Sequence, residues 1–260
     1  MIRSLWSAAT GMQGQQLKLD VIAHNLANVN TAGFKKSRVD FEDLLYQKLK
    51  LAGALNAEGN QIPVGMEIGL GVRPVSVSKI FSQGEYEQTN NELDLAIEGK
   101  GFFKVLVNGE ELYTRAGHFK IDRDGYLVTP NGARLQPEIT VPQNTVRLEI
   151  TQDGQVNAVF GDGTIQNLGQ LMLYDFPNPA GLYALGRNLY RASDAAGDVI
   201  EGQPGREGFG TIAQGYLEMS NVDVVEEMVQ MIVTQRAYEA NSKTIQTADN
   251  MLEMANNVKR

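Results

Sequence analysis

Apolar side chains recur at steps of three and four residues over both ends of the chain. Near the start, the repeat marks the row Leu5, Ala8, Met12, Gln15, Leu19, Ile22 and Leu26. Near the end, it marks the row Val225, Met228, Ile232, Gln235, Tyr238, Ser242, Ile245, Ala248, Leu252 and Ala255. Such steps are typical of a helix face that keeps meeting a partner helix. The pattern predicts one helix over residues 2–26 and a longer one from Val222 to the chain end.

Local signals place the ends of these two helices. The segment Asn28–Gly33 contains asparagines and a glycine that tolerate the left-handed conformation in which helices stop. Ser220 is a good N-cap residue for the second helix, and Asp223, Glu226 and Glu227 follow it near the positive end of the helix dipole. We therefore expect Ser220 to cap the second helix.

The middle of the chain follows a different pattern. Short β-type runs cover 72–79, 102–107, 112–115, 119–122, 146–151, 155–160 and 170–175. Turn dipeptides stand between them: Asn108-Gly109, Asp124-Gly125, Asn131-Gly132, Asp153-Gly154 and Asp162-Gly163. Dipeptides of this kind close hairpins, and closely spaced strands without helical patterns between them indicate an antiparallel all-β domain.

These patterns together predict an α+β protein. Either helix alone fits an ordinary amphipathic helix that covers a core, but two long helices at opposite chain ends favour coiled-coil pairing. We expect a helical domain from residues 1–30 with 220–260 and a connecting segment with an extended exposed stretch over 31–66. An antiparallel all-β domain is expected over 67–215.

Composition and charge exclude several classes of protein. The 260 residues include 42% apolar and 21% charged residues, which fits a folded chain. The absence of cysteine excludes disulfides, thiolate metal sites and a cysteine nucleophile. The net charge of −8 argues against nucleic acid as a partner. The polar residues that follow Arg3 leave no apolar region for a secretory signal peptide, and no apolar run is long enough to cross a bilayer.

Candidate chemistry is sparse. His24 and His118 are the only imidazoles, and neither has a second histidine at a spacing that would build a metal site. No nucleophile elbow or phosphate-binding loop is present in the sequence. We therefore expect no catalytic site, no bound metal and no cofactor.

Two terminal motifs carry a resemblance to a known family. The run Leu19–Lys35, LDVIAHNLANVNTAGFK, resembles the N-terminal signature of the bacterial flagellar axial proteins, the rod and hook family. The run Gln214–Met228, QGYLEMSNVDVVEEM, and its continuation Gln235–Lys243 resemble the other end of the same family. With about 260 residues and an extra stretch near 46–66, the chain is most similar to the distal rod members.

The resemblance implies a mechanical role. Distal rod members polymerise helically into a hollow shaft that transmits torque from the motor to the hook, with their terminal helices in an inner tube. The expected partners are further copies, other rod subunits, the hook-side junction, the surrounding ring proteins and the flagellar type III export apparatus. Export without a cleaved signal peptide would place the chain in the basal body, in the rod that crosses the periplasm to the outer membrane. The stretch near 46–66 would bridge subunits.

Two sets of residues are expected to carry this role. The expected assembly contacts are Leu5, Met12, Leu19, Ile22, Leu26, Met228, Ile232, Tyr238, Ile245 and Leu252. The expected turn that fixes how the first helix leaves the tube is formed by Asn28, Asn30, Thr31, Gly33 and Phe34. A proximal rod or hook subunit is the nearest alternative, and a secreted β-domain adhesin with coiled-coil ends is a more distant one.

Overall fold

The computed structural model describes residues 2–51, 53, 61 and 63–257, and these residues form two compact units. Unit 1 comprises residues 1–26, 37–78 and 223–260, and unit 2 comprises residues 27–36 and 79–222. Residues 67–78 therefore group with the helices, whereas the sequence placed them in the β-rich part. The predicted stretch near 46–66 lies partly outside the described residues.

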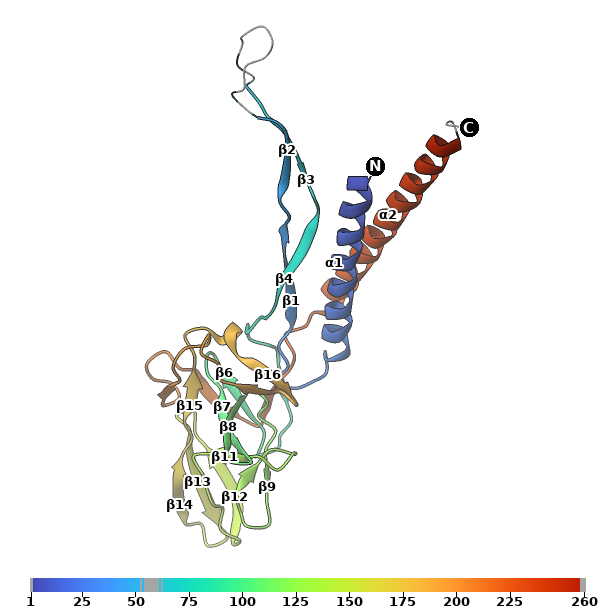
Figure 1. The fold of residues 1–260 in the computed structure, drawn as a ribbon. Helices are drawn as coiled ribbons and strands as arrows, with labels where there is room; N and C mark the ends of the chain where they lie inside the picture. Colours follow the sequence, from blue (N-terminus) through green and yellow to red (C-terminus); the bar gives the residue numbers. More distant parts are fainter. Residues whose placement is uncertain (1, 52, 54–60, 62, 258–260) are drawn as a thin grey trace. The chain divides into compact units, whose positions relative to one another are not determined.

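Unit 1 combines two long helices with a two-stranded ribbon (Figure 1). Its elements are α1 (Ile2–Ala27), β1 (Ser37–Asp43), β2 (Tyr46–Lys50), β3 (Met66–Gly69), β4 (Val72–Lys79) and α2 (Val224–Asn257). Strand β1 pairs with β4, and β2 pairs antiparallel with β3, so that Tyr46 lies opposite Gly69. The helices run in opposite directions (Figure 1). Neither helix in the described part of the chain is long and apolar enough to cross a membrane.

The start of α2 differs from the prediction. The Asp223 carboxylate accepts hydrogen bonds from the backbone N–H groups of Val225 at 2.8 Å and Glu226 at 3.1 Å, so Asp223 is the N-cap. The helix begins at Val224. Ser220 is buried and its hydroxyl has no hydrogen-bond partner. The expectation that Ser220 caps this helix was wrong, because Asp223 stands closer to the first free N–H groups.

Unit 2 is built from short antiparallel strands. Its first half contains β5 (Tyr86–Gln88), β6 (Leu95–Glu98), β7 (Phe103–Val107), β8 (Glu110–Thr114), β9 (Lys120–Ile121), β10 (Leu127–Val128), β11 (Arg134–Gln136) and β12 (Thr145–Ile150). Its second half contains β13 (Gln155–Phe160), β14 (Ile165–Gln170), β15 (Leu173–Asp175), a 3-10 turn (Pro179–Gly181), β16 (Tyr183–Gly186), β17 (Leu189–Arg191), β18 (Ile200–Gly202), β19 (Thr211–Gln214) and β20 (Tyr216–Glu218).

The largest sheet of unit 2 has the strand order β16-β17-β8-β7-β11-β10-β9. A second sheet has the order β12-β13-β14, and three two-stranded sheets pair β15 with β18, β19 with β6 and β20 with β5. Each of the five predicted turn dipeptides connects two antiparallel neighbours in these sheets. At Asn108-Gly109 both residues have positive φ, 52° and 85°, as a type I′ hairpin turn requires.

The core of unit 2 has an aliphatic part and an aromatic part. Strands of both larger sheets contribute side chains such as Val105, Leu148 and Val156 to the first part, and β6 contributes Leu95. Phe102, Tyr113, Phe176 and Tyr190 form the second part, in which ring pairs meet mostly edge to face. The mixed architecture of terminal helices and a β-rich middle confirms the predicted α+β class, whereas coiled-coil pairing stays a prediction.

Candidate assembly surface and charged junction

The predicted contact residues of α1 face the interior of unit 1. Ile22 is buried, and Leu5, Met12, Leu19 and Leu26 are half-buried. Part of this burial comes from the ribbon. A Cβ atom on Gly14 would lie 3.1 Å from the Phe41 ring, and the Val72 N–H donates to the Thr10 hydroxyl at 3.4 Å. The apolar row of α1 is therefore largely covered within its own chain.

The predicted contact residues of α2 lie mostly on the surface. Ile232 is 57% exposed, Met228 and Tyr238 are also exposed, Leu252 lies at the boundary, and Ile245 alone is half-buried. The inward face of α2 instead carries the buried residues Glu227, Thr234 and Ala248 and the half-buried residues Met231 and Asn241, at steps of three, four and seven residues. At 3.6 residues per turn, this face lies opposite the first exposed apolar residues. The helix thus turns several polar side chains inward and its first apolar side chains outward.

The outward face of α2 is concentrated in its first three turns. We refer to Val225, Met228, Val229, Ile232 and Val233 as the outer α2 face; all five side chains are exposed. Monomeric soluble proteins rarely leave a continuous apolar surface of this kind open to water. The outer α2 face is therefore a candidate for contacts with another molecule.

Polar side chains take part in contacts between α1 and α2 at three places. The Asn25 amide donates to the Glu227 carboxylate at 3.3 Å, and the Lys18 ammonium donates to the Gln230 side chain at 3.2 Å. Farther along, a Cβ atom on Gly11 would lie 3.0 Å from the Asn241 amide. These contacts fix an antiparallel register, because residues earlier in α1 lie beside residues later in α2.

The predicted turn after α1 is compact. The Thr31 hydroxyl donates to the Asn28 side chain at 3.3 Å, and the Phe34 N–H donates to the Thr31 carbonyl at 3.2 Å. Gly33 has a φ of 71°, and a Cβ atom there would lie 2.5 Å from the Ala116 nitrogen. Only glycine fits this position. Phe34 is buried and Asn30 is exposed, so the structure brings four of the five turn residues together and leaves Asn30 on the surface.

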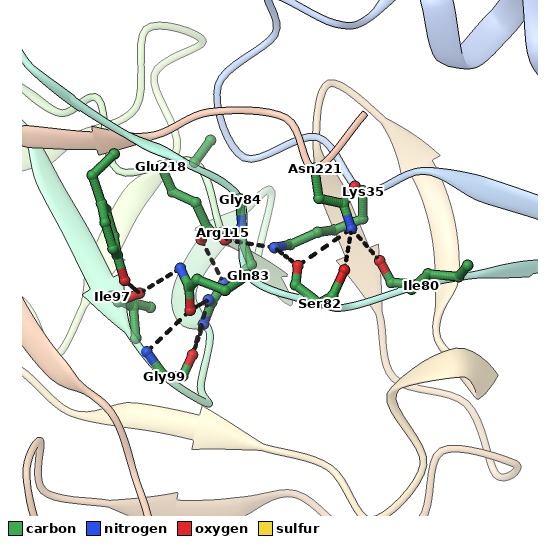
Figure 2. A network of polar contacts seen from close by, with 12 residues as sticks. Lys35, Ile80, Ser82, Gln83, Gly84, Ile97, Gly99, Arg115, Glu218 and Asn221 are labelled. Atoms are coloured by element: carbon green, nitrogen blue, oxygen red, sulfur yellow. Dashed lines mark hydrogen bonds and ion pairs between the residues drawn. The ribbon is translucent and has the colours of Figure 1, made fainter. Parts of the chain in front are cut away.

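A buried charged junction directly follows this turn (Figure 2). The Lys35 ammonium lies 2.5 Å from one Glu218 oxygen, and the Arg115 guanidinium lies 2.9 Å from the other. The side chains of Lys35 and Glu218 are 0% exposed and that of Arg115 is 4% exposed. Two buried cations therefore share one carboxylate. We call these three residues the charged junction.

Hydrogen bonds satisfy the remaining polar atoms of the charged junction. Arg115 donates to the carbonyls of Gly99 and Gly101 and to the Gln83 side chain, and Lys35 donates to the Ser82 carbonyl at 2.7 Å. Burial lowers the pKa of Lys35, nearby Glu218 opposes this effect, and the positive charge of Arg115 adds to it. The net pKa of Lys35 lies below its usual value, as expected for an ammonium held away from water beside a second cation.

Sequence reasoning did not identify the charged junction. Lys35 and Glu218 each lie within one of the two terminal motifs, and Arg115 ends a β-type run. Nothing in the sequence connects the three residues. The usable signal is a charged residue within a run of mostly apolar or small residues, as Arg115 is in the run Leu112–Phe119. That signal marks a buried charge but cannot say which residues lie beside it.

The two histidines have separate surroundings. His24 is exposed on α1, and His118 is half-buried, with a pKa that burial lowers and an Nδ1 atom that has no hydrogen-bond partner. Within the part of the chain that the structure describes, no group of three or more His, Cys, Asp or Glu side chains could hold a metal ion.

Comparison with known protein families gives three matches along the chain. Residues 5–35 match the family described as flagella basal body rod protein, and residues 213–258 match the C-terminal family of flagellar basal body rod FlgEFG proteins. Residues 96–158 match the D1 domain of the flagellar hook proteins FlgE, FlgF and FlgG. The two terminal matches cover both motifs that the sequence had singled out.

Individual relatives align over nearly the whole chain. The flagellar basal-body rod protein FlgG of Buchnera aphidicola (from Schizaphis graminum) is 48% identical over 97% of this chain and 98% of its own length. The FlgG proteins of Borreliella burgdorferi and Bacillus subtilis are 48% and 41% identical over the full length of both chains. Among solved structures, the Helicobacter pylori hook protein FlgE2 covers 71% of this chain and 43% of its own at a TM-score of 0.26, too low to support an argument about the fold.

Proposed function

This chain belongs to the FlgG family of flagellar basal-body rod proteins, structural and non-enzymatic subunits of the distal rod, and we propose that it polymerises helically into a hollow, torque-transmitting shaft. The outer α2 face is the observation that carries this proposal. An interface repeated by a rotation that does not close into a ring produces a helical polymer. Other copies of the chain would cover the exposed apolar side chains.

The proposed arrangement assigns different tasks to the two helices. The half-buried row Leu5, Met12, Leu19, Ile22 and Leu26 would hold the helices within one subunit. Met228, Ile232, Tyr238 and Leu252 would contact neighbouring subunits, and Ile245 would lie at the border between these regions. Coiled-coil-like packing would then arise mainly between copies. Residues 1–30 with 220–260 would form the inner tube, and residues 67–215 the outer part.

The remaining partners follow from the same family membership. We propose contacts with other rod subunits, the hook-side junction and the surrounding ring proteins, the last through unit 2. We also propose that the flagellar type III export apparatus exports the chain, and that the chain lies in the rod that crosses the periplasm to the outer membrane. The hook protein of Borreliella burgdorferi is only 25% identical to this chain, which favours a rod subunit over a hook subunit.

Deletion of the gene in its source organism tests the proposed role. We expect isolated basal bodies to carry shafts that stop short and lack a hook, and complementation with the intact gene to restore them, as seen by electron microscopy. A complete rod that lacks only its hook would identify a hook subunit instead. Intact, motile flagella would contradict any axial role and favour the adhesin.

The ribbon of β1 to β4 is the second proposed contact with neighbouring subunits. Its exposed apolar side chains include Leu45, which is 84% exposed, as well as Tyr46, Leu49, Met66 and Ile68. An isolated two-stranded hairpin is only marginally stable in water. We propose that neighbouring subunits cover this ribbon, and that the bridge between them stiffens the shaft.

Shortening the ribbon is expected to produce flexible shafts. Replacement of residues 47–68 by Asn-Gly joins Tyr46 to Gly69, which already lie opposite each other, through a two-residue hairpin turn. Electron micrographs of the isolated basal bodies should then show bent rods in place of straight ones. The control, Lys48→Ala with Glu67→Ala, removes an exposed ion pair and keeps the apolar side chains of the ribbon. Straight rods in the shortened variant would contradict the proposed bridge.

A further inference from the structure

The chain passes between the two units four times, after Leu26, Lys36, Ser78 and Val222. A chain segment between two units can act as a swivel, because rotation about φ and ψ is resisted only by contacts. In a shaft that carries torque, such segments must be held in one conformation. Two asparagine side chains hold the backbone at these crossings, one in each unit.

Asn221 holds three segments together in unit 2 (Figure 2). Its side-chain oxygen accepts a hydrogen bond from the Lys36 N–H at 2.7 Å, and its amide donates to the Ile80 carbonyl at 2.9 Å. The same amide lies 2.9 Å from the Ser82 hydroxyl. The Ile80 N–H in turn donates to the Lys36 carbonyl at 2.9 Å. The second, third and fourth crossings are thus tied to one side chain on the unit 2 side.

Asn25, which is 2% exposed, likewise holds three segments together in unit 1. Its side-chain oxygen accepts from the Ser37 N–H at 2.9 Å, and its amide donates to the Ser37 carbonyl at 2.9 Å and to the Glu227 carboxylate at 3.3 Å. These bonds join the end of α1, the start of β1 and the first turn of α2. They lie beside the first, second and fourth crossings.

Lys36 and Ser37 are consecutive residues on either side of one crossing, so each unit holds its own end of the same peptide. A carboxamide suits both positions, since one side chain offers an acceptor to an N–H group and a donor to a carbonyl group. We propose that Asn25 and Asn221 are paired positioning residues that hold this peptide fixed, so that rotation of the helical unit is carried to the β-rich unit. We call this pair of asparagines with the Lys36–Ser37 peptide the clasp. Its role in carrying torque rests on the proposed function, whereas the hydrogen bonds that form it do not.

Asparagine-to-aspartate substitutions test the clasp, because they keep the size and the acceptor oxygen and remove the donor. In Asn25→Asp the new carboxylate would face the Ser37 carbonyl and Glu227, and in Asn221→Asp it would face the Ile80 carbonyl. Loss of a net contribution of about one hydrogen bond raises the population of unclasped chains on the order of tenfold. Asn167→Asp, in an exposed side-chain pair on β14, is the matched control.

The readout is the spread of distances between the two units. The chain has no cysteine, so Gln16→Cys and Arg123→Cys, both at exposed positions, provide one spin label in each unit of the full chain. We expect a narrow distance distribution for the parent and for Asn167→Asp, and a broad one for Asn25→Asp and Asn221→Asp. Adding Glu227→Gln to Asn25→Asp supplies a donor to the new carboxylate and should narrow the distribution again.

Folding and function are measured on the same variants. Circular dichroism identifies the folded samples, and Asn221→Ser, which shortens the side chain without adding charge, replaces Asn221→Asp if the latter does not fold. Unchanged distance distributions in both positions would overturn the clasp, whatever the function of the chain. Broad distributions together with normal swimming in a viscous medium would overturn its role in carrying torque. Slower swimming with complete basal bodies is the expected result.

Discussion

Ile232→Asp is expected to abolish assembly of the shaft and to leave the free energy of unfolding of the single chain almost unchanged. Ile232 is 57% exposed on the outer α2 face, so the isolated chain tolerates a charge there. In a polymer the same position would lie against a neighbour. Losing an isoleucine contact costs about 1.5–3 kcal/mol, and burying an unpaired carboxylate adds at least as much. The affinity of each subunit contact should fall on the order of a thousandfold or more.

Complementation of the deletion strain measures this effect. Cells that express Ile232→Asp should lack hooks and swimming, while urea unfolding of the purified variant should match the parent. Ile165→Asp is the matched control, because Ile165 is 63% exposed on β14 in unit 2 and undergoes the same substitution away from the outer α2 face. Normal flagella with Ile232→Asp, or equal loss with Ile165→Asp, would show that the outer α2 face is not the subunit contact.

The apolar period of the terminal segments was enough to predict both helices, but not which face of α2 turns inward. Rows of apolar residues identify a face that avoids water, and they do not say whether the covering surface belongs to the same chain. In α2 the buried positions include Glu227 and Thr234, which a search for apolar rows passes over. Glu227 is buried because Asn25, about 200 residues away along the chain, donates to it. Such pairings follow only from the folded chain.

The β-rich unit shows the same division between local and long-range information. The hairpin turns were predictable because Asn-Gly and Asp-Gly have a strong local preference for positive φ. Strands β16 to β20 were not predicted, because each is three or four residues long and all but β16 pair with strands far away along the chain. The β6–β19 pairing, for instance, joins Ile97 to Ile212. Local propensity cannot decide strands of that length.

The charged junction is the clearest case of a site that sequence reasoning could not assemble. Lys35 and Glu218 are 183 residues apart, and Arg115 and Glu218 are 103 residues apart. From the sequence alone, each of these three residues would be expected to be an ordinary exposed charge. Their burial places the two chain segments that lead to the helices against the same strand end of unit 2, so the stability of this unit should depend strongly on the shared carboxylate.

Glu218→Gln is therefore expected to destabilise unit 2 by about 3–5 kcal/mol, as when one member of a buried ion group is removed. The amide keeps the shape of the side chain, but Lys35 and Arg115 then remain as buried cations without a counter-charge. The urea midpoint of the β-sheet signal should fall accordingly. Glu87→Gln, an exposed position on β5 opposite Leu217, is the matched control and should change little.

A second substitution and a pH series separate charge from packing. Lys35→Met removes one of the two buried cations, and adding it to Glu218→Gln should recover part of the lost stability. The folded-state pKa of Lys35 lies below its usual value of 10.5, so the unfolded chain binds more protons between these two values. Stability of Glu218→Gln should therefore rise relative to the Lys35→Met double variant as the pH approaches 10.5. A deficit that neither Lys35→Met nor alkaline pH reduces would mean that Glu218 acts through its shape and hydrogen bonds, because only a charge effect responds to both.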